Sequence, residues 1–436
     1  MKGGRALHVA VWSLLLLITM GQAAAAQQDG PIVLRVATHI NDPELVEPQI
    51  EIMRRFEDLH PGVKIEVWYT DSNNYQDQLL AQYLGGIGPD VATILRPYFA
   101  SYIAAGLIQP LDRFIEADPD FSLDSVIPSL MYSGMYKGSV YGFPVYNGPA
   151  QLFYNQDAFI DRGVAEPPEY IAQNAWDWDT FVEVAKKMTY DTNGDGRPDV
   201  CGYDGYATWD AGWVPFIRAA GGDIIGPDGR SWLNRPESIQ GLEFLNNLNV
   251  VHQVTRNPGH GGCSYAVGGT AMRIRWQTTA FIEKNLIQAF NLEVALNPAG
   301  PAGYAHLAGG VPVTVSRHTQ HPEIAYEFAK WLATESGLWK VRGGPPLTFA
   351  ELRSEEYRST LQLFENWILF ERAIIEGDPR PEPQFGVVEH DAMNRILYDV
   401  MITPVINGQV AVRTAMEEAH RLLSDLLEAE TAREGG

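Results

Sequence analysis

Oxygen-bearing side chains alternate along one short stretch of the 436-residue chain, between Asp191 and Asp199. A glycine at the sixth position of such a stretch lets the loop wrap around a calcium ion. The ligands would be the side chains of Asp191, Asn193, Asp195 and Asp199 and the carbonyl of Arg197. The twelfth position is Gly202 instead of the glutamate of an EF-hand, so a helix carboxylate such as Asp179 or Glu183 would have to complete the shell. A metal-free turn is the alternative, and any calcium here would be structural.

Aromatic residues crowd the stretch that follows: Tyr203, Tyr206, Trp209, Trp213 and Phe216. An indole can stack on the apolar C–H face of a pyranose ring, while carboxylates and amides bind the sugar hydroxyls. Aromatic side chains at helical spacing usually fill a core instead, and this is the alternative. We expect Trp209 to contact a ligand, and Trp213 to be either core or a second wall of the site.

The elements that would position a site begin near the N-terminus. Apolar periodicity predicts strands over 32–38, 63–69 and 89–94 and helices over 44–59 and 75–84. This β-α-β-α-β order predicts a parallel sheet with helices on both faces, and ligands of such sheets bind beyond the carboxyl ends of the strands. The polar residues at that edge are Asn41, Asp42, Thr70, Asp71 and Arg96.

A β-rich aromatic segment near the middle of the chain is interrupted by Pro144. A central strand tolerates proline poorly, because proline donates no hydrogen bond to the ladder. A segment that leaves one sheet and enters another tolerates it well. We therefore interpret residues 144–148 as a crossing between two lobes, with Tyr146 and Asn147 facing the cleft; an edge strand with a surface tyrosine is the alternative.

Several motifs in order along the chain resemble family 1 extracellular solute-binding proteins of ABC importers. They are FEDLHPGVKIEV, LLAQYLGGIGPDVATI, AAGLIQPLDRFI, YKGSVYGFPVYNGPAQLFYNQDAF and HPEIAYEFAKWLAT. Each motif is weak alone, but their order and spacing together are specific, and the resemblance covers nearly the whole mature chain.

The resemblance implies an α/β fold of the two-lobed periplasmic binding protein type (type II-like). Each lobe would be a central sheet flanked by helices. Residues 27–145 and about 298–343 would form lobe 1, and about 146–297 and 344–436 lobe 2. Hinge crossings would lie near 144–148, 292–298 and 342–348.

The resemblance also implies further site residues. Trp276 is the best stacking candidate, although Arg275 replaces the glycine that is usual in its motif. Gly309 and Gly310 would let backbone amides approach a ligand, or would only form a turn. Arg342 would hold two hydroxyls or an acidic group with its guanidinium fork, or would be a surface arginine.

Composition and charge limit the classes of molecule that the protein could bind. The net charge of −22 and the pI of about 4.8 disfavour nucleic acid and anionic lipid. Two cysteines, Cys201 and Cys263, are too few for a disulfide scaffold or a thiolate zinc site, and the sequence leaves open whether they pair.

The first 26 residues have the organisation of a secretory signal peptide. Lys2 and Arg5 precede an apolar run over 9–18, and alanines at 23–26 offer a cleavage site after Ala26. The run is shorter than the ~20 residues that a spanning helix needs. No cysteine near the cleavage site could carry a lipid, so we expect a periplasmic protein of a two-membrane bacterium.

Signatures of enzymes are scarce, because the chain has no Gly-x-Ser-x-Gly elbow, no His-Glu-x-x-His helix and no phosphate-binding loop. We expect a monomer that requires no cofactor, captures a mono- or oligosaccharide or polyol, and delivers it to a membrane permease. The alternatives are a secreted carbohydrate-active enzyme with paired carboxylates, or a binding protein for glycerol-phosphate or another non-sugar solute.

Overall fold

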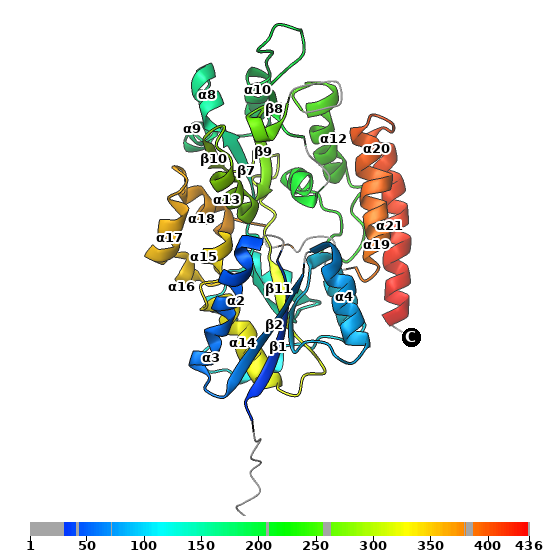
Figure 1. The fold of residues 1–436 in the computed structure, drawn as a ribbon. Helices are drawn as coiled ribbons and strands as arrows, with labels where there is room; N and C mark the ends of the chain where they lie inside the picture. The colour runs from blue at the N-terminus through cyan, green and yellow to red at the C-terminus, as the bar shows by residue number, and fades with distance from the viewer. Residues whose placement is uncertain are drawn as a thin grey trace, which may run out of the picture.

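The computed structural model describes residues 30–40, 43–70, 72–205, 209–255, 263–378, 380 and 387–434. The predicted signal peptide lies outside these residues. Two main sheets lie one above the other in Figure 1. We call the region around the five-stranded sheet the first lobe and the region around the four-stranded sheet the second lobe.

The first sheet has the strand order β2-β1-β3-β11-β6. Its strands are β1 (Ile32–His39), β2 (Val63–Thr70), β3 (Val91–Thr93), β6 (Gly142–Val145) and β11 (Val311–Val315). Strand β1 pairs in parallel with β2 and β3, as the β-α-β-α-β pattern predicts, whereas β11 runs antiparallel to β3 and β6.

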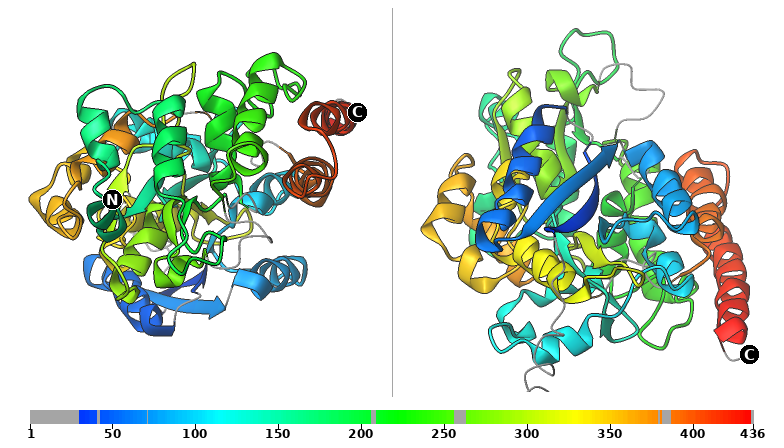
Figure 2. Two further views of the ribbon diagram at one scale, coloured as in Figure 1. Left: turned by 90° about the horizontal axis from the view of Figure 1, so that it is seen from above. Right: turned by 60° about the horizontal axis from the view of Figure 1, so that its bottom comes forward.

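Helices cover both faces of the first sheet, with α4 on one side and α2, α3 and α14 on the other (Figures 1 and 2). The bounds are α2 (Val46–Arg54), α3 (Phe56–Leu59), α4 (Ser72–Leu84), α5 (Phe99–Ala104), α6 (Asp112–Ala117), α7 (Pro128–Met131) and α14 (Pro322–Thr334). Successive strand residues point to opposite faces. Leu34 and Val36 accordingly pack with α2 and α14, while Ala37 packs with α4.

The second sheet has the order β10-β7-β9-β8. Its strands are β7 (Ala150–Asn155), β8 (Cys201–Tyr203), β9 (Thr270–Trp276) and β10 (Leu292–Ala295). Helices α8 (Gln156–Arg162), α9 (Pro167–Ala172), α10 (Trp178–Lys187), α11 (Val214–Ala219), α12 (Pro236–Val250) and α13 (Gln277–Leu286) surround it. Cys201 and Cys263 form a disulfide with a Cα–Cα distance of 5.4 Å, which decides the question that the sequence left open.

The last hundred or so residues add helices to both lobes. These are α15 (Trp339–Arg342), α16 (Phe349–Leu352), α17 (Glu355–Leu361), α18 (Ile368–Ile375), α19 (His390–Asn394), a π-helical stretch (Arg395–Ile402), α20 (Thr403–Ile406) and α21 (Val412–Glu434). The long helix α21 packs on α12 and stands at the side of the molecule in Figures 1 and 2. Among the described residues, no helix is both long enough and apolar enough to cross a bilayer.

The chain passes from the first sheet to the second between β6 and β7, over residues 146–149. Tyr146, Asn147 and Gly148 have φ angles of 65°, 57° and 83°, and two successive non-glycine residues in this region are uncommon. Tyr146 is buried in the apolar cluster of the first lobe, and its hydroxyl donates to Oε1 of Gln49 over 3.0 Å. The crossing therefore turns sharply and is anchored at its start.

Candidate functional site

Two predicted site residues meet between the lobes. Arg96 follows β3 in the first lobe, and Trp276 is the last residue of β9 in the second lobe. The guanidinium carbon of Arg96 lies 4.4 Å from the centroid of the Trp276 ring, within the range of a cation–π contact. Trp276 is only 8% exposed, and the described residues offer its indole N–H no acceptor. The ring face that the sequence predicts for a ligand is thus covered by an arginine of the opposite lobe.

Asp210 and Tyr398 lie close enough to Arg96 to act on its charge. Burial lowers the pKa of Arg96, and the negative charge of Asp210 partly offsets this effect. Burial likewise raises the pKa of the Tyr398 hydroxyl, and the Asp210 carboxylate adds to the shift. Sequence reasoning missed both residues: Asp210 adjoins the candidate Trp209, but Tyr398 lies in a C-terminal segment with no local signal.

A second charged cluster lies at the carboxyl ends of β8 and β9. Oδ2 of Asp204 lies 3.0 Å from Nη2 of Arg275 and 3.6 Å from Nε of Arg273. Nη1 of Arg273 lies 3.3 Å from Oε1 of Glu283, whose pKa is raised by burial, with Arg273 opposing the rise. Arg275, which replaces the usual glycine of the motif, therefore keeps β9 regular and pairs with Asp204.

The two tryptophans of the aromatic stretch, Trp209 and Trp213, differ in their exposure to solvent. Trp213 is 0% exposed and packs edge-on against Tyr398 in the core of the second lobe. Of the two alternatives for Trp213, a core residue or a second wall of the site, the structure supports the core residue. A direct contact between Trp213 and a ligand therefore has no support. Trp209 is 59% exposed and leaves its ring available.

The paired glycines serve packing at this position. A Cβ on Gly310 would lie 2.8 Å from Cβ of Pro144 and 2.9 Å from the Val145 carbonyl oxygen. The Gly310 amide donates to Oγ of Ser133 over 2.8 Å, and the Gly309 carbonyl accepts from the Gly148 amide over 3.0 Å. The glycines thus let the start of β11 lie against the crossing segment.

Four other predicted residues are described incompletely or not at all. Asn41, Asp42 and Asp71 lie outside the described residues. Arg342 is placed by its backbone only, at the end of α15. The structure brings Tyr146 and Asn147 to the crossing, where the Asn147 carbonyl accepts from the Thr278 amide over 3.2 Å. A further contact between the lobes is made by Tyr98 and His390, whose ring centroids lie 5.1 Å apart.

The predicted calcium loop is closed by its own hydrogen bonds. Oδ1 of Asp191 accepts from the amides of Asn193 and Gly194 over 2.9 and 2.7 Å, and Oδ2 accepts from the amide of Gly196 over 2.7 Å. These bonds, that from Gly196 first, lower the pKa of Asp191. Within the described part of the chain, no three His, Cys, Asp or Glu residues lie close enough together to hold a metal ion. Calcium binding remains a prediction.

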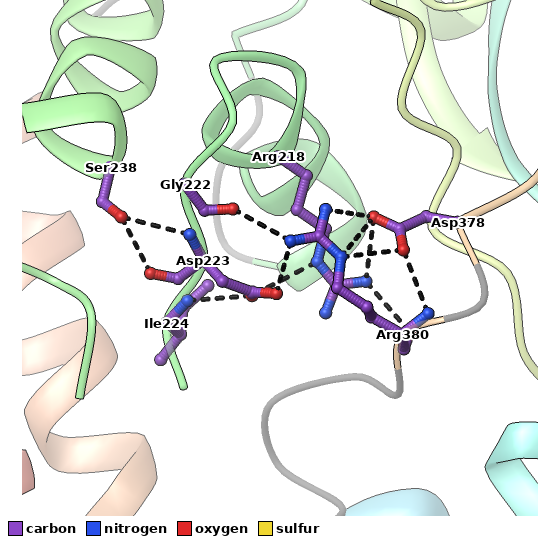
Figure 3. A network of polar contacts seen from close by, with 7 residues as sticks. All are labelled: Arg218, Gly222, Asp223, Ile224, Ser238, Asp378 and Arg380. Carbon is purple, nitrogen blue, oxygen red and sulfur yellow. Dashed lines mark hydrogen bonds and ion pairs between the residues drawn. The ribbon is translucent and has the colours of Figure 1, made fainter. Parts of the chain in front are cut away.

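A network of two arginines and two aspartates, all buried except the partly exposed Arg380, fixes the segment that leads into the C-terminal helices (Figure 3). Nε of Arg218 lies 3.3 Å from Oδ1 of Asp223, and its Nη1 lies 3.7 Å from Oδ2 of Asp378. Nη1 of Arg380 lies 2.9 Å from Oδ2 of Asp223 and donates to the Gly222 carbonyl over 3.2 Å. The network binds α11 to a segment about 160 residues later in the sequence.

Comparison with known proteins defines the class. Residues 42–338 match the profile of the bacterial extracellular solute-binding protein family, which covers most of the chain. The chain therefore belongs to this family, whose members are exported binding proteins and not enzymes.

Particular relatives are similar over parts of their length. The chain is 24% identical over 295 residues to the arabinooligosaccharide-binding protein of Halalkalibacterium halodurans, covering 64% of this chain and 62% of that protein. It is 30% identical over 178 residues to an uncharacterised lipoprotein of Streptomyces antibioticus, covering 41% of this chain and 38% of that protein. The chain thus spans less than two thirds of either relative.

The fold is shared over a larger span. An ABC substrate-binding protein of Listeria monocytogenes, solved in complex with cycloalternan, superposes with a TM-score of 0.72 at 21% identity. The superposition covers 91% of this chain and 98% of the Listeria chain. The predicted two-lobed α/β fold is therefore confirmed.

Proposed function

We propose that this protein captures a neutral carbohydrate, either a sugar or a polyol, between its lobes and delivers it to the membrane permease of an ABC importer. The observation that carries the proposal is the position of Trp276 at the boundary between the lobes, with Arg96 of the first lobe on its ring face. An indole beside guanidinium and carboxylate groups suits a ring that is apolar on its faces and hydroxylated at its edge.

The balance of charge supports a neutral ligand over a phosphorylated or otherwise charged one. Around Arg96 and in the charged cluster at the carboxyl ends of β8 and β9, the described groups comprise three guanidiniums and three carboxylates: Arg96, Arg273 and Arg275 against Asp204, Asp210 and Glu283. A phosphate buried here would require a cation that is not already paired, because an uncompensated buried charge is costly. Hydroxyl groups require no such partner.

Closure of the lobes would follow from the crossing geometry. Hinge residues absorb the change in backbone angles when a two-lobed binding protein closes around its ligand. The left-handed residues at 146–148 are suited to this role, because they already adopt an unusual conformation between two rigid sheets. The closed form would present the surface that the permease recognises.

Export to the periplasm through a cleaved signal peptide is part of the proposal. The apolar run over 9–18 and the alanines before residue 27 support cleavage after Ala26. The Streptomyces relative is a lipoprotein, so the mode of retention differs among similar proteins. Intact mass of the protein released from the periplasm should correspond to a chain that starts at Gln27, without an added lipid.

A thermal-shift screen tests the ligand class. Monosaccharides, oligosaccharides, polyols and their phosphorylated counterparts would be compared at equal concentration, because a ligand that binds the native state raises the melting temperature by mass action. We expect a rise with at least one neutral sugar or polyol and a smaller rise or none with its phosphate. Stoichiometric binding of the best compound, with a decrease in the radius of gyration in X-ray scattering, would support capture between the lobes. A rise with the charged compounds alone would reject the neutral class.

A further inference from the structure

A pocket of about 470 Å³ lies on the outer side of the first lobe, lined by residues from the segments 56–60, 114–120 and 323–335. It runs along one face of α14, between α3 on one side and the end of α6 on the other. The α3 residues precede the start of β2, whereas Arg96 follows the end of β3. This α14 pocket therefore lies at the opposite edge of the sheet from the candidate sugar site.

The walls of the α14 pocket are aromatic. Phe114 stacks on Tyr326 with ring centroids 5.3 Å apart, and Phe56 lies 5.4 Å from Trp331. All four side chains are largely buried in the first lobe, so the pocket has a rigid apolar wall. Such a wall suits an aliphatic chain, and its ring faces attract cations.

The rim of the pocket is acidic. Its lining includes five carboxylates, Asp118, Asp120, Glu323, Glu327 and Glu335, against one lysine, Lys330, and one histidine, His60. Glu323 lies in the first turn of α14 and Glu335 follows its last residue, so the rise of a helix separates them by about 18 Å. The carboxylates thus stand at both ends of an elongated pocket with the aromatic wall between them.

Two basic side chains of the protein already lie in the pocket, each against an aromatic ring and beside a carboxylate. The Lys330 ammonium lies 2.5 Å from Oδ2 of Asp118 and 5.6 Å from the centroid of the Tyr326 ring. The His60 ring stacks on Phe56 at 4.0 Å, with Nδ1 3.7 Å from Oε2 of Glu327. Burial opposes the negative charge of Asp118, but hydrogen bonds, that from Lys330 first, outweigh it and lower its pKa.

Three carboxylates of the rim remain after these pairs are formed. None of the described residues forms an ion pair with Asp120, Glu323 or Glu335. A metal ion does not fit them, because no group of three such ligands among the described residues is close enough. An anion would be repelled, and an uncharged chain would leave the acidic ends without a partner.

We propose that the α14 pocket binds a linear aliphatic di- or polyamine. Its ammonium groups would lie at the carboxylates of the two ends, and its methylene chain would lie against Phe56, Tyr326 and Trp331. The same chemistry is available from a free polyamine or from a protein segment with spaced lysines. This inference is independent of the ligand between the lobes.

Fluorine NMR of protein labelled with 5-fluorotryptophan provides the test, because Trp331 forms part of the wall and its resonance is assigned with Trp331→Phe. The probes are putrescine, spermidine and spermine, with 1,4-butanediol as the uncharged control. We expect a saturable shift of the Trp331 resonance that is tightest for the longest amine, absent for the diol and weaker at high salt. No saturable shift with any amine would overturn the proposal.

Matched variants locate the binding. Glu323→Gln combined with Glu335→Gln should weaken spermine binding about tenfold, since each exposed pair is worth up to ~1 kcal/mol. Glu237→Gln is the control, because Glu237 follows Pro236 at the start of α12 as Glu323 follows Pro322 at the start of α14. Equal losses in the control, or no loss in the double variant, would overturn the proposal. All variants are exposed substitutions whose folding is checked by their melting curves.

An acetylated peptide with two lysines separated by two residues distinguishes the sources. Tighter binding of the peptide than of spermine, lost in the same double variant, would assign the pocket to a basic protein segment. Tighter binding of spermine would assign it to the free amine. Binding of both that is unchanged in the double variant would contradict a site at α14.

Discussion

The two lobes differ in how they use charge. In the second lobe, Arg218 and Asp223 form an ion pair in which the side chains are only 2% and 3% exposed, and Arg273 and Asp204 are similarly buried. Among the described ion pairs of the first lobe, such as Arg35–Asp90, at least one partner is always more than a tenth exposed. The second lobe also contains the disulfide.

The difference follows from the regularity of the backbone. The first lobe is built on strands whose amides pair with one another, so its core is filled by apolar side chains together with small hydrogen-bonded polar ones such as Thr314. The second lobe includes irregular segments around Gly222 and Asp378, whose carbonyls and amides must find other partners. Arg218 donates to the Arg380 carbonyl over 3.0 Å, and Arg380 donates to that of Gly222. Buried charges therefore replace ladder hydrogen bonds there.

Among the variants that test this difference between the lobes, Arg218→Ala is expected to lower the free energy of unfolding most. Removal of the guanidinium leaves Asp223 and Asp378 buried with Arg380 alone, and breaking a buried pair in this way costs about 3–5 kcal/mol. Urea denaturation followed by circular dichroism measures the loss. Arg421→Ala is the control: Arg421 pairs with Glu418 on the surface of α21 and should cost less than ~1 kcal/mol. Equal losses in the free energy of unfolding for the two variants would show that the buried network stabilises the protein no more than a surface ion pair does.

Removal of the disulfide should have a similar or slightly smaller effect. The bond joins residues 62 positions apart, and the chain-entropy relation gives about 4 kcal/mol for such a loop. Cys201→Ser/Cys263→Ser is compared with the wild type by denaturation and by amide hydrogen exchange. Faster exchange confined to β8 and the start of β9 would tie the loss to the second lobe, whereas equal acceleration in β1 would contradict a local role.

The sequence predicts the first lobe better than the second, and for a physical reason. Its strands and helices follow one another with short turns, so the period of apolar residues reports each element directly. The parallel pairing of β1 with β2 and β3 then follows from connection rules. The antiparallel β11, which returns to this sheet more than 200 residues later, has no local signal.

The candidate site shows the same limit. Trp209 and Trp213 stand one turn apart, yet one is exposed and the other is core, because the packing partner Tyr398 comes from a distant segment. The contact between Arg96 and Trp276 joins residues 180 positions apart. Residue types and strand ends suggest each member of the site, but only the packed structure shows which members meet.

Acid should weaken the second lobe through His306. This side chain is fully buried, and burial lowers its pKa from 6.5 to about 3, with Arg372 as the second cause. Above pH 6.5 both folded and unfolded states hold it neutral. As the pH falls from 6.5 towards 3, only the unfolded state binds the proton, so stability falls by up to ~1.4 kcal/mol per pH unit.

Denaturation curves across this pH range measure the effect. His306→Gln should flatten the dependence, because the unfolded state then has one proton fewer to bind. His318→Gln, at an exposed histidine, is the matched control and should keep the loss. A wild-type slope retained in His306→Gln would remove His306 as the cause.

The contact between the lobes is tested by Trp276→Ala. We expect the ligand to take the place of Arg96 on the indole face. Burying an apolar face on the indole is worth ~1.5–3 kcal/mol, so the best compound from the screen should bind about 10- to 100-fold more weakly to the variant. Calorimetric titration well below the melting temperature measures the affinity, because loss of a ring covered by Arg96 should also lower that temperature. Trp209→Ala is compared with it. Intact affinity in folded Trp276→Ala, with a loss in Trp209→Ala, would move the stacking wall to the exposed tryptophan.

The smallest effect is expected at the loop from Asp191 to Asp199. Its carboxylates already accept hydrogen bonds from the loop's own amides, so the loop is held in shape without the ion and calcium should add little stability. With a dissociation constant of ~0.1–1 mM, typical of extracellular sites, millimolar calcium would add only about 0.5–1.5 kcal/mol. For a chain of this length we expect a rise of about 1–2 °C in melting temperature on adding calcium after chelation.

Two Asp-Gly-Arg turns of the second lobe make the test specific. Oδ1 of Asp195 accepts from the Arg197 amide over 2.8 Å, and Oδ1 of Asp228 accepts from the Arg230 amide over 3.2 Å. Asp195→Ala and Asp228→Ala therefore remove the same kind of turn bond, but only the first removes a predicted calcium ligand. The calcium-dependent rise should vanish in Asp195→Ala and persist in Asp228→Ala. If the wild type melts at the same temperature with chelator and with calcium, the loop is a turn held by its own hydrogen bonds. The irregular segments of the second lobe, this loop and the one around Gly222, would then both be fixed without metal.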